Sequence, residues 1–217
     1  MDPDGQNNKE ITPPGYGDQV PSASGDGRPI VFASSRNGAD EIRRADIDGG
    51  NAKQLTTCGK NNSPSVSRDG KWVVYVSSCD GIGALWRVPS EGGQPLRLTD
   101  RAVLTPWVSP DSRWIACGYK AESNKWQLAI LPIEAGPPAK LFDVAPQANF
   151  NGGQRWTPDG KAVTYRDWLQ GLWRQAVEGG PPQRIPGLPE EKTSLSRTAR
   201  CSLASASAIR ATGPRSP

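Results

Sequence analysis

Two kinds of turn signal recur through this chain in constant phase. The first is Asp-Gly, or Asp-Ser in the third copy, at steps of 43, 42 and 48 residues: Asp26, Asp69, Asp111 and Asp159. The second is an acidic residue followed by glycine or alanine: Asp48, Glu91, Glu134 and Glu178. Asp-Gly favours a tight hairpin because glycine takes φ > 0 without a Cβ clash and aspartate bonds the neighbouring backbone. Two independent signals in one phase indicate a repeat protein.

The segments between the turns have the composition of strands. Lys71–Val76 is rich in β-branched and aromatic residues, Leu85–Val88 follows a longer loop, and Leu96–Thr99 follows the second turn. With Val66–Ser67 before the first turn, each unit contains four short strands. A period of roughly 40 to 45 residues with four strands is typical of a β-propeller blade. The sequence therefore predicts an all-β fold, an incomplete β-propeller of four-stranded antiparallel blades.

The unit also resembles a known family. Ser67–Ser77, Leu85–Val88 and Glu91–Thr99 are similar to the TolB-like, WD-like repeat of bacterial β-propellers, and the pattern covers residues 1 to about 190. The resemblance implies a binding or scaffolding module, since such propellers occur free in the periplasm or fused to kinases, peptidases and transcriptional regulators. It also implies a periplasmic or extracytoplasmic location.

The phase of the repeat divides the chain. Residues 1–20 align on the second half of a blade, because Met1–Thr12 matches Ala45–Thr56 without a gap. Residues 21–191 then provide four blades, about 21–62, 63–105, 106–152 and 153–191. Residues 192–217 contain no strand run and no acidic residue, so we expect a disordered, low-complexity tail. Translation in a shifted reading frame would account for its composition.

The tail also accounts for the positive net charge. The whole chain has 26 Lys and Arg against 22 Asp and Glu, but five of the basic residues lie in 192–217. The propeller part is near neutral, and we therefore expect no specific nucleic-acid partner. No apolar run approaches the ~18 to 20 residues that cross a bilayer, so no transmembrane segment is expected.

The residues offer no catalytic constellation. Histidine is absent, which removes His-activated nucleophiles, His metal sites and the commonest general base. No nucleophile elbow, phosphate loop or kinase signature is present. Asp46-x-Asp48 lacks the third oxygen ligand and the distal glutamate of a calcium loop. We predict a non-enzyme with no cofactor and no metal site, although the chain could belong to a larger enzyme.

The four cysteines have no metal-like spacing. Cys58 and Cys79 fall in loops that a propeller places on one face of adjoining blades, so both a disulfide and two free thiols stay open. Cys117 is expected to be a buried apolar residue within a strand.

Candidate binding residues come from the loops between second and third strands, which lie outside the repeat pattern. In a propeller these loops share one rim with the connections between blades, and a variable loop on a rigid scaffold is a common binding site. Trp168 stands out because an exposed aromatic beside charged residues is a frequent contact residue. Ordinary solvated loops are the alternative. The candidates are Arg36, Asn37, Asp80, Lys120, Asn124, Arg166, Asp167 and Trp168.

The sequence thus predicts a non-catalytic binding or scaffolding propeller for a protein or peptide ligand. The alternative is a sensor or gating propeller of a fused enzyme, a Ser/Thr protein kinase or a serine peptidase. Missing propeller blades are the other expected partner, because outer blades would expose strand edges and apolar faces. Without those blades we expect marginal stability or self-association.

Overall fold

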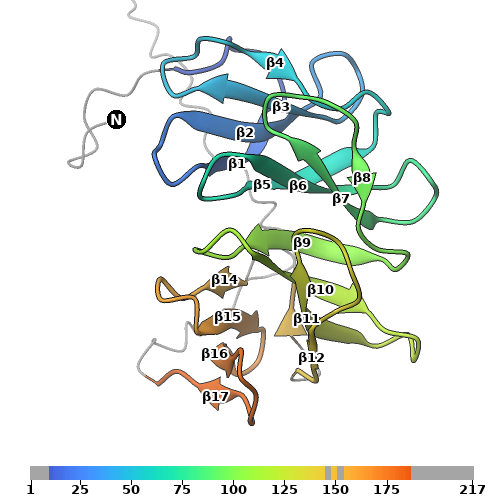
Figure 1. Cartoon of the computed structure of the whole chain (residues 1–217), viewed down its shortest axis with the longest axis vertical. Coiled ribbons are helices and arrows are strands. Elements are labelled where there is room, and N and C mark those ends of the chain that lie inside the picture. Colours follow the sequence, from blue (N-terminus) through green and yellow to red (C-terminus); the bar gives the residue numbers. More distant parts are fainter. Residues whose placement is uncertain (1–9, 145–147, 151–153, 187–217) are drawn as a thin grey trace, which may run out of the picture.

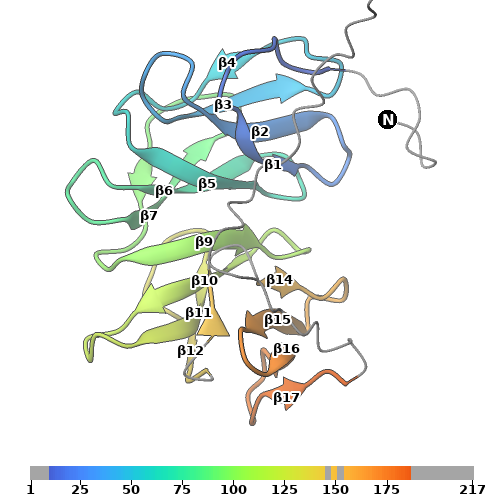
Figure 2. The same ribbon diagram turned by 180° about the vertical axis from the view of Figure 1, so that it is seen from behind.

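The computed structural model describes residues 10–144, 148–150 and 154–186, and this part of the chain contains strands and no helix. The strands form four antiparallel sheets that follow one another in sequence order. Figure 1 shows them along the long axis, from the blue sheet at the top to the orange sheet at the bottom, and Figure 2 shows the same order from behind. The predicted all-β propeller architecture is confirmed.

Each sheet is a meander whose strands are neighbours in sequence. Sheet 1 contains β1 (Gln19–Ala23), β2 (Pro29–Ser34), β3 (Glu41–Asp46) and β4 (Lys53–Gln54). Sheet 2 contains β5 (Asn61–Val66), β6 (Trp72–Ser77), β7 (Ala84–Pro89) and β8 (Leu96–Arg97). Sheet 3 contains β9 (Val103–Val108), β10 (Trp114–Lys120), β11 (Trp126–Pro132) and β12 (Lys140–Phe142). In sheet 4, β13 (Ala148–Asn149) and β14 (Arg155–Trp156) both pair with β15 (Ala162–Asp167), followed by β16 (Gly171–Ala176) and β17 (Gln183–Arg184).

The recurring aspartates close the hairpins between first and second strands. The Ser24 hydroxyl donates to Asp26 Oδ1 at 2.5 Å, and the same carboxylate oxygen accepts from the Arg28 amide at 3.1 Å. The hydrogen bond from Ser24 is the main cause that lowers the pKa of Asp26. The arrangement recurs at the other three turns. Ser112 takes the glycine position of the third turn with a φ of 61°, which explains how Asp-Ser replaces Asp-Gly there.

Three hydrophobic cores lie between consecutive sheets. In β6, Val73 and Tyr75 pack toward sheet 1, whereas Val74 and Val76 pack toward sheet 3. Both faces of the strand are therefore buried, which is why it reads as a continuous apolar run. The third core joins sheets 3 and 4 and includes Tyr165. Tryptophans at recurring positions pack at the margins of these cores, as expected of side chains that fill the space between blades: Trp72, Trp86, Trp114, Trp156 and Trp173.

The first strands lie closest to a common axis. Strands β1, β5, β9 and β14 contact one another in succession, while the fourth strand of each sheet lies at its opposite edge. The sheets therefore fan outward, as propeller blades do. Figure 1 shows two sets of connections: the four aspartate turns lie on the left, and loops such as β6–β7 and β10–β11 lie on the right. We call the left side the turn rim and the right side the loop rim.

An arginine of the third strand links each of the first two blades to the next. Arg44 of β3 binds the Ser90 carbonyl and the Glu91 carboxylate of sheet 2. In the same register, Arg87 of β7 donates to the Ile133 carbonyl at 2.7 Å and to Glu134 Oε2 at 2.8 Å in sheet 3. We call this pair of contacts the arginine latch. It explains the acidic residue that opens the second recurring turn in sheets 2 and 3, Glu91 and Glu134.

The ends of the chain differ from the repeats. Residues 10–18 form no strand, and Ile11 packs on Ile30, Phe32 and Ala45 of sheet 1. The first strands of the four sheets begin a few residues before the blade boundaries expected from the turns, and the division into domains stays a prediction. Residues 1–9 of the half-blade and the tail at 192–217 lie outside the described residues. No described segment forms a helix with the length and apolar character that a membrane span requires.

Candidate functional site

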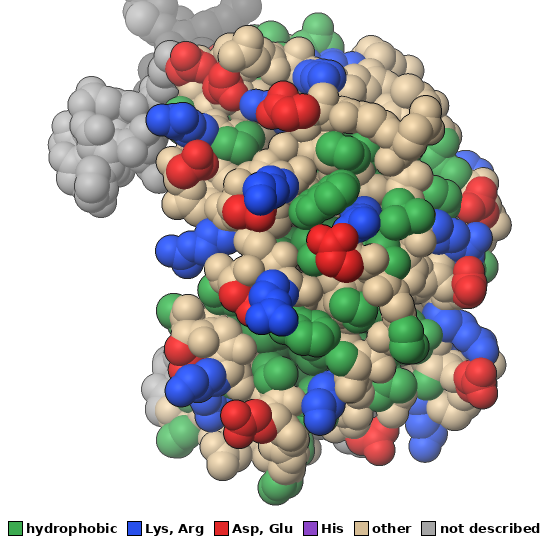
Figure 3. All heavy atoms as spheres, in the orientation of Figure 1, with side chains coloured by type: hydrophobic (Ala, Val, Ile, Leu, Met, Phe, Trp, Pro, Cys, Tyr) green, Lys and Arg blue, Asp and Glu red, His purple; other side chains and the backbone are tan. Residues whose placement is uncertain are grey.

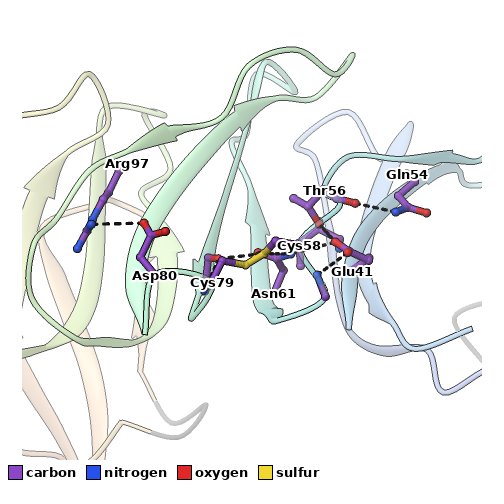
Figure 4. The surroundings of a disulfide bond; sticks show 11 residues. Glu41, Gln54, Thr56, Cys58, Asn61, Cys79, Asp80 and Arg97 are labelled. Atoms are coloured by element: carbon purple, nitrogen blue, oxygen red, sulfur yellow. Dashed lines mark hydrogen bonds and ion pairs between the residues drawn. A yellow bond between two sulfur atoms is a disulfide. The ribbon is translucent and has the colours of Figure 1, made fainter. Parts of the chain in front are cut away.

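The loop rim is anchored by a buried carboxylate at the junction of sheets 1 and 2 (Figure 4). Glu41, which begins β3, is only 4% exposed. Its Oε2 accepts hydrogen bonds from the Thr56 hydroxyl and from Asn61 Nδ2, the latter at 2.9 Å, and its Oε1 accepts from the Gly59 amide at 2.6 Å. Three donors from the segment that connects the two sheets thus replace the water that a carboxylate loses on burial.

A disulfide lies beside this carboxylate. Cys58, in the connection before β5, is bonded to Cys79, in the β6–β7 loop, with a Cα–Cα distance of 6.0 Å. Asn61 contacts both the Cys58 sulfur and Glu41, so the two features form one cluster (Figure 4). Of the alternatives that the sequence left open for these cysteines, the structure contains the disulfide. Cys117 is buried, and burial raises the pKa of its thiol.

We expect removal of this disulfide to destabilise the protein measurably. The bridge closes a loop with a sequence separation of 21 residues, for which restriction of the unfolded chain stabilises the fold by about 3 kcal/mol. The double variant Cys58→Ser, Cys79→Ser should therefore unfold at lower urea concentration than the oxidised wild type. Reduced wild type should match the double variant. Equal unfolding midpoints for oxidised and reduced wild type would contradict the prediction.

Several of the predicted binding residues have structural partners. Arg36 donates to the Asp18 carboxylate at 2.8 Å and lies over the Tyr16 ring at 4.5 Å, so it fixes residues 10–18 against sheet 1. Asp80 is exposed and pairs with Arg97 at 3.4 Å. Asn124 occupies a turn with a φ of 63°, a conformation that asparagine tolerates.

The remaining candidates of the first three blades differ in exposure. Asn37 is exposed at the tip of the β2–β3 loop, whereas Lys120 is the last residue of β10 and is half-buried. The five candidates of the first three blades, from Arg36 to Asn124, therefore lie in or beside three loops of one rim, one loop in each blade.

Blade 4 presents an apolar tip on the loop rim. Asp167 ends β15 and is buried, and its Oδ1 accepts hydrogen bonds from the Leu169 and Gln170 amides, both at 2.8 Å. This carboxylate shapes the turn that exposes Trp168, at 63%, and Leu169, at 80%. The Arg166 guanidinium lies 5.1 Å from the centre of the Trp168 ring. The structure thus brings together three predicted residues, Arg166, Asp167 and Trp168, with Asp167 in a shaping role.

A cavity of about 430 Å³ opens on the same rim between sheets 2 and 3. Its apolar lining comes from Val76, Val103, Leu104 and Trp126, and its polar lining includes Ser63 and Thr105. Ser63 and Thr105 have positive φ values of 50° and 38°, and Val20 has a φ of 51° at the equivalent place of β1. A residue other than glycine held in this region stores strain, which is common at binding sites. Each of the three precedes a proline, at positions 21, 64 and 106, so this conformation is a recurring feature of the first strands and not a signal for the cavity alone.

The turn rim carries a second cavity, of about 450 Å³, with a different chemistry. Its walls include Arg44 and five acidic side chains: Asp26, Asp46, Asp48, Asp69 and Glu91. Arg44 already pairs with two of them, Asp46 at 3.1 Å and Glu91. Among the described residues, no group of three or more Cys, Asp or Glu side chains is placed to hold a metal ion. We therefore assign this cavity to the arginine latch and take the loop rim as the candidate site.

Comparison with solved structures identifies the same architecture. TolB from Acinetobacter baumannii is 24% identical and superposes with a TM-score of 0.63, over 80% of this chain and 47% of that one. A putative TolB from Agrobacterium tumefaciens is 18% identical with a TM-score of 0.67, over 82% of this chain and 65% of that one. An oligogalacturonate lyase in complex with manganese is 15% identical with a TM-score of 0.62, over 80% and 55%.

The chain thus spans between about half and two thirds of the length of these structures. No protein-family model and no curated protein sequence matches it. At these identities the likeness concerns the fold, and one of the similar proteins is an enzyme by its description. The four sheets, their order and the comparisons agree that this chain is a partial β-propeller of the TolB-like architecture.

Proposed function

We propose that the four blades form a non-catalytic binding or scaffolding module whose loop rim contacts a protein or peptide. The observation that carries the proposal is the tip of blade 4, where the Asp167 carboxylate holds Trp168 and Leu169 in an exposed turn. A fixed aromatic tip loses little conformational entropy on binding, and tryptophan is enriched among residues that dominate binding energy. The cavity beside Trp126 offers a second apolar contact on the same rim.

The charges of the described residues support a neutral binding surface. Lys and Arg side chains alternate with Asp and Glu over the face seen in Figure 3, without a region of a single sign. Both oxygens of the buried Glu41 carboxylate and Oδ1 of the buried Asp167 carboxylate accept hydrogen bonds from backbone or side-chain donors, which gives them structural roles. These features favour shape and apolar contact over attraction of a polyanion, and they support a protein or peptide ligand.

We extend the proposal to a location outside the cytoplasm. The Cys58–Cys79 disulfide supports it, because disulfides persist in oxidising compartments and are rare in the reducing cytosol. The disulfide state of the protein, measured by thiol labelling directly after lysis with alkylation, tests this extension. Fully reduced Cys58 and Cys79 in cells would contradict it.

Replacement of Trp168 by alanine should weaken ligand binding about tenfold or more. Peptides selected from a random phage-displayed library on the full chain serve as probes, and their affinities are measured by fluorescence anisotropy. Ile47→Ala provides the control, because Ile47 is 55% exposed on the opposite rim. Both variants should keep the unfolding free energy within about 0.5 kcal/mol of wild type, since both side chains are exposed. Selected peptides that bind Trp168→Ala and wild type equally would refute the assigned tip.

A second candidate is a sensor or gating propeller of a fused enzyme. A specific likeness favours it: the β-propeller domain of the Trilobed protease from Pyrococcus furiosus superposes with a TM-score of 0.59 at 12% identity, over 78% of this chain. The coding sequence on either side of this chain in its genome distinguishes the two. An in-frame kinase or peptidase domain supports the second candidate, and further blades behind a secretion signal support the first.

A further inference from the structure

Arg174 of β16 occupies the register position of the two latch arginines. Each of the three residues pairs with a second-strand residue and a fourth-strand residue at equivalent places. The amide of the residue after the fourth strand confirms the register, because it donates to the third strand in all three sheets: Leu55 to Ile42, Leu98 to Leu85, and Ile185 to Leu172. The guanidinium of Arg174 therefore belongs on the face where a following sheet would lie.

Unlike those of its counterparts, the Arg174 side chain takes part in no hydrogen bond or ion pair within residues 10–144, 148–150 and 154–186. Its charge contributes to lowering the pKa of the Asp159 carboxyl, for which the hydrogen bond from Thr157 is the larger cause. Arg44 and Arg87 each bind a backbone carbonyl and a carboxylate of the next sheet. Arg174 is in the equivalent position, but the described part of the chain provides no carbonyl and no carboxylate that its guanidinium binds.

The surface around Arg174 is more polar than the equivalent faces upstream. Val31 and Val74 lie opposite the latch arginines of sheets 1 and 2, and Ala116 lies opposite Ile130, which takes the arginine position in sheet 3; all three are fully buried. Sheet 4 has Thr164 there, and it is half-buried. This face carries the polar residues Thr164, Arg166 and Arg174, so it can stay hydrated, and its two positive charges attract carboxylates. Leu172 is its half-buried apolar residue.

The opposite end of the blade array is covered. Ile11 packs on the outer face of sheet 1, and its carbonyl would lie only 2.6 Å from a Cβ added at Gly49. Gly49 belongs to the turn that corresponds to the acceptor turns of sheets 2 and 3. Since residues 10–18 lie over this face, the end of sheet 1 in a second copy is a poor acceptor for Arg174. Among the described residues, the array therefore has one covered end, at sheet 1, and one end, at sheet 4, on which no further sheet packs.

We propose that the outer face of sheet 4 docks a following antiparallel blade, and that Arg174 binds a carbonyl and an acidic side chain in the turn between the third and fourth strands of that blade. This partner is a β-sheet that continues the blade array, and it differs from the ligand of the loop rim. The chain spans 47% and 65% of the two TolB structures, which supports the presence of further blades in the intact assembly.

The test adds to the chain a fifth blade that contains a carbonyl and a glutamate known to bind a latch arginine. A copy of residues 98–142, which contains Ile133 and Glu134, is joined directly after Arg184, so that its Leu98 takes the place of Ile185. A second extended chain carries residues 55–97, which contain Ser90 and Glu91. Unfolding by urea is followed by tryptophan fluorescence and circular dichroism for both extended chains and for the original chain, each with and without Arg174→Met.

We expect Arg174→Met to leave the original chain nearly unchanged and to shift the unfolding equilibrium of an extended chain about tenfold toward the unfolded state. Replacing the copied Glu134 or Glu91 of the added blade by glutamine should remove the destabilisation that Arg174→Met causes. A double-mutant cycle of the two changes measures this coupling. The Arg87–Glu134 pair measured in the same chain is the positive control. Equal effects in original and extended chains, or failure of both added blades to fold, would overturn the proposal. So would a dimer of the original chain that Arg174→Met dissociates, because it would identify a second copy as the occupant.

Discussion

Replacement of Leu128 by alanine is expected to lower the free energy of unfolding by about 3 to 5 kcal/mol. Leu128 of β11 is fully buried in the core between sheets 3 and 4, together with Phe150, Val163 and Tyr165. Alanine would leave a cavity that two rigid sheets cannot close, so the loss of dispersion contacts adds to the loss of apolar burial. The effect should be large because this core is what attaches sheet 4 to the remainder of the array.

Leu141→Ala is the matched control for this change. Leu141 lies in the neighbouring strand β12 and is 45% exposed, so the same substitution there should cost less than about 1 kcal/mol. Urea unfolding monitored by tryptophan fluorescence compares the two, because Trp156 and Trp173 lie beside the core that contains Leu128. Equal destabilisation by both variants would show that the sheets are not packed as described.

Replacement of Glu41 by alanine is expected to cost about 3 kcal/mol or more. The buried carboxylate accepts from Thr56, Asn61 and the Gly59 amide, and its removal leaves these three donors without their acceptor. A hydrogen bond to a charged group contributes about 1.5 to 3 kcal/mol, and the three contacts are not additive. Glu41→Gln should be intermediate, because its amide group restores one acceptor oxygen and brings a donor toward other donors.

The neighbouring Asp40 gives the control for Glu41. Its side chain is exposed, so Asp40→Ala should change the unfolding free energy by no more than about 0.5 kcal/mol, and its backbone contacts with the Lys60 segment are unaffected by the substitution. Thermal and urea denaturation of the four proteins rank the effects. A wild-type unfolding free energy in Glu41→Ala would mean that the junction of sheets 1 and 2 does not depend on this cluster.

Local signals were sufficient to predict the fold. The four Ser/Thr-x-Asp turns are set by contacts within five residues, so their chemistry is visible in the sequence. The apolar run of β6 follows equally from local composition. These short-range features recur in one phase, and a blade is the one supersecondary unit that fits their period and strand number.

The candidate site was predicted less completely. The loop rim followed from the strand order, and Trp168 is exposed as expected. The ion pair of Arg36 with Asp18 was not foreseen, because its partner lies 18 residues away in a segment that precedes the first strand of sheet 1. Leu169 was missed as well, since only the turn held by Asp167 determines its exposure. The spacing of Cys58 and Cys79 could not decide their pairing, which depends on how two loops approach in space.

By itself, the sequence determined that the chain forms four-stranded units and in what phase they repeat, because hairpin turns and strand composition act over a few residues. Only the tertiary structure decided which polar side chains form hydrogen bonds and ion pairs between blades and which are exposed to a partner. Glu41, Arg44 and Arg87 meet acceptors or donors that lie about 15 to 47 residues away. Such meetings depend on the angle between consecutive sheets, which no local signal encodes.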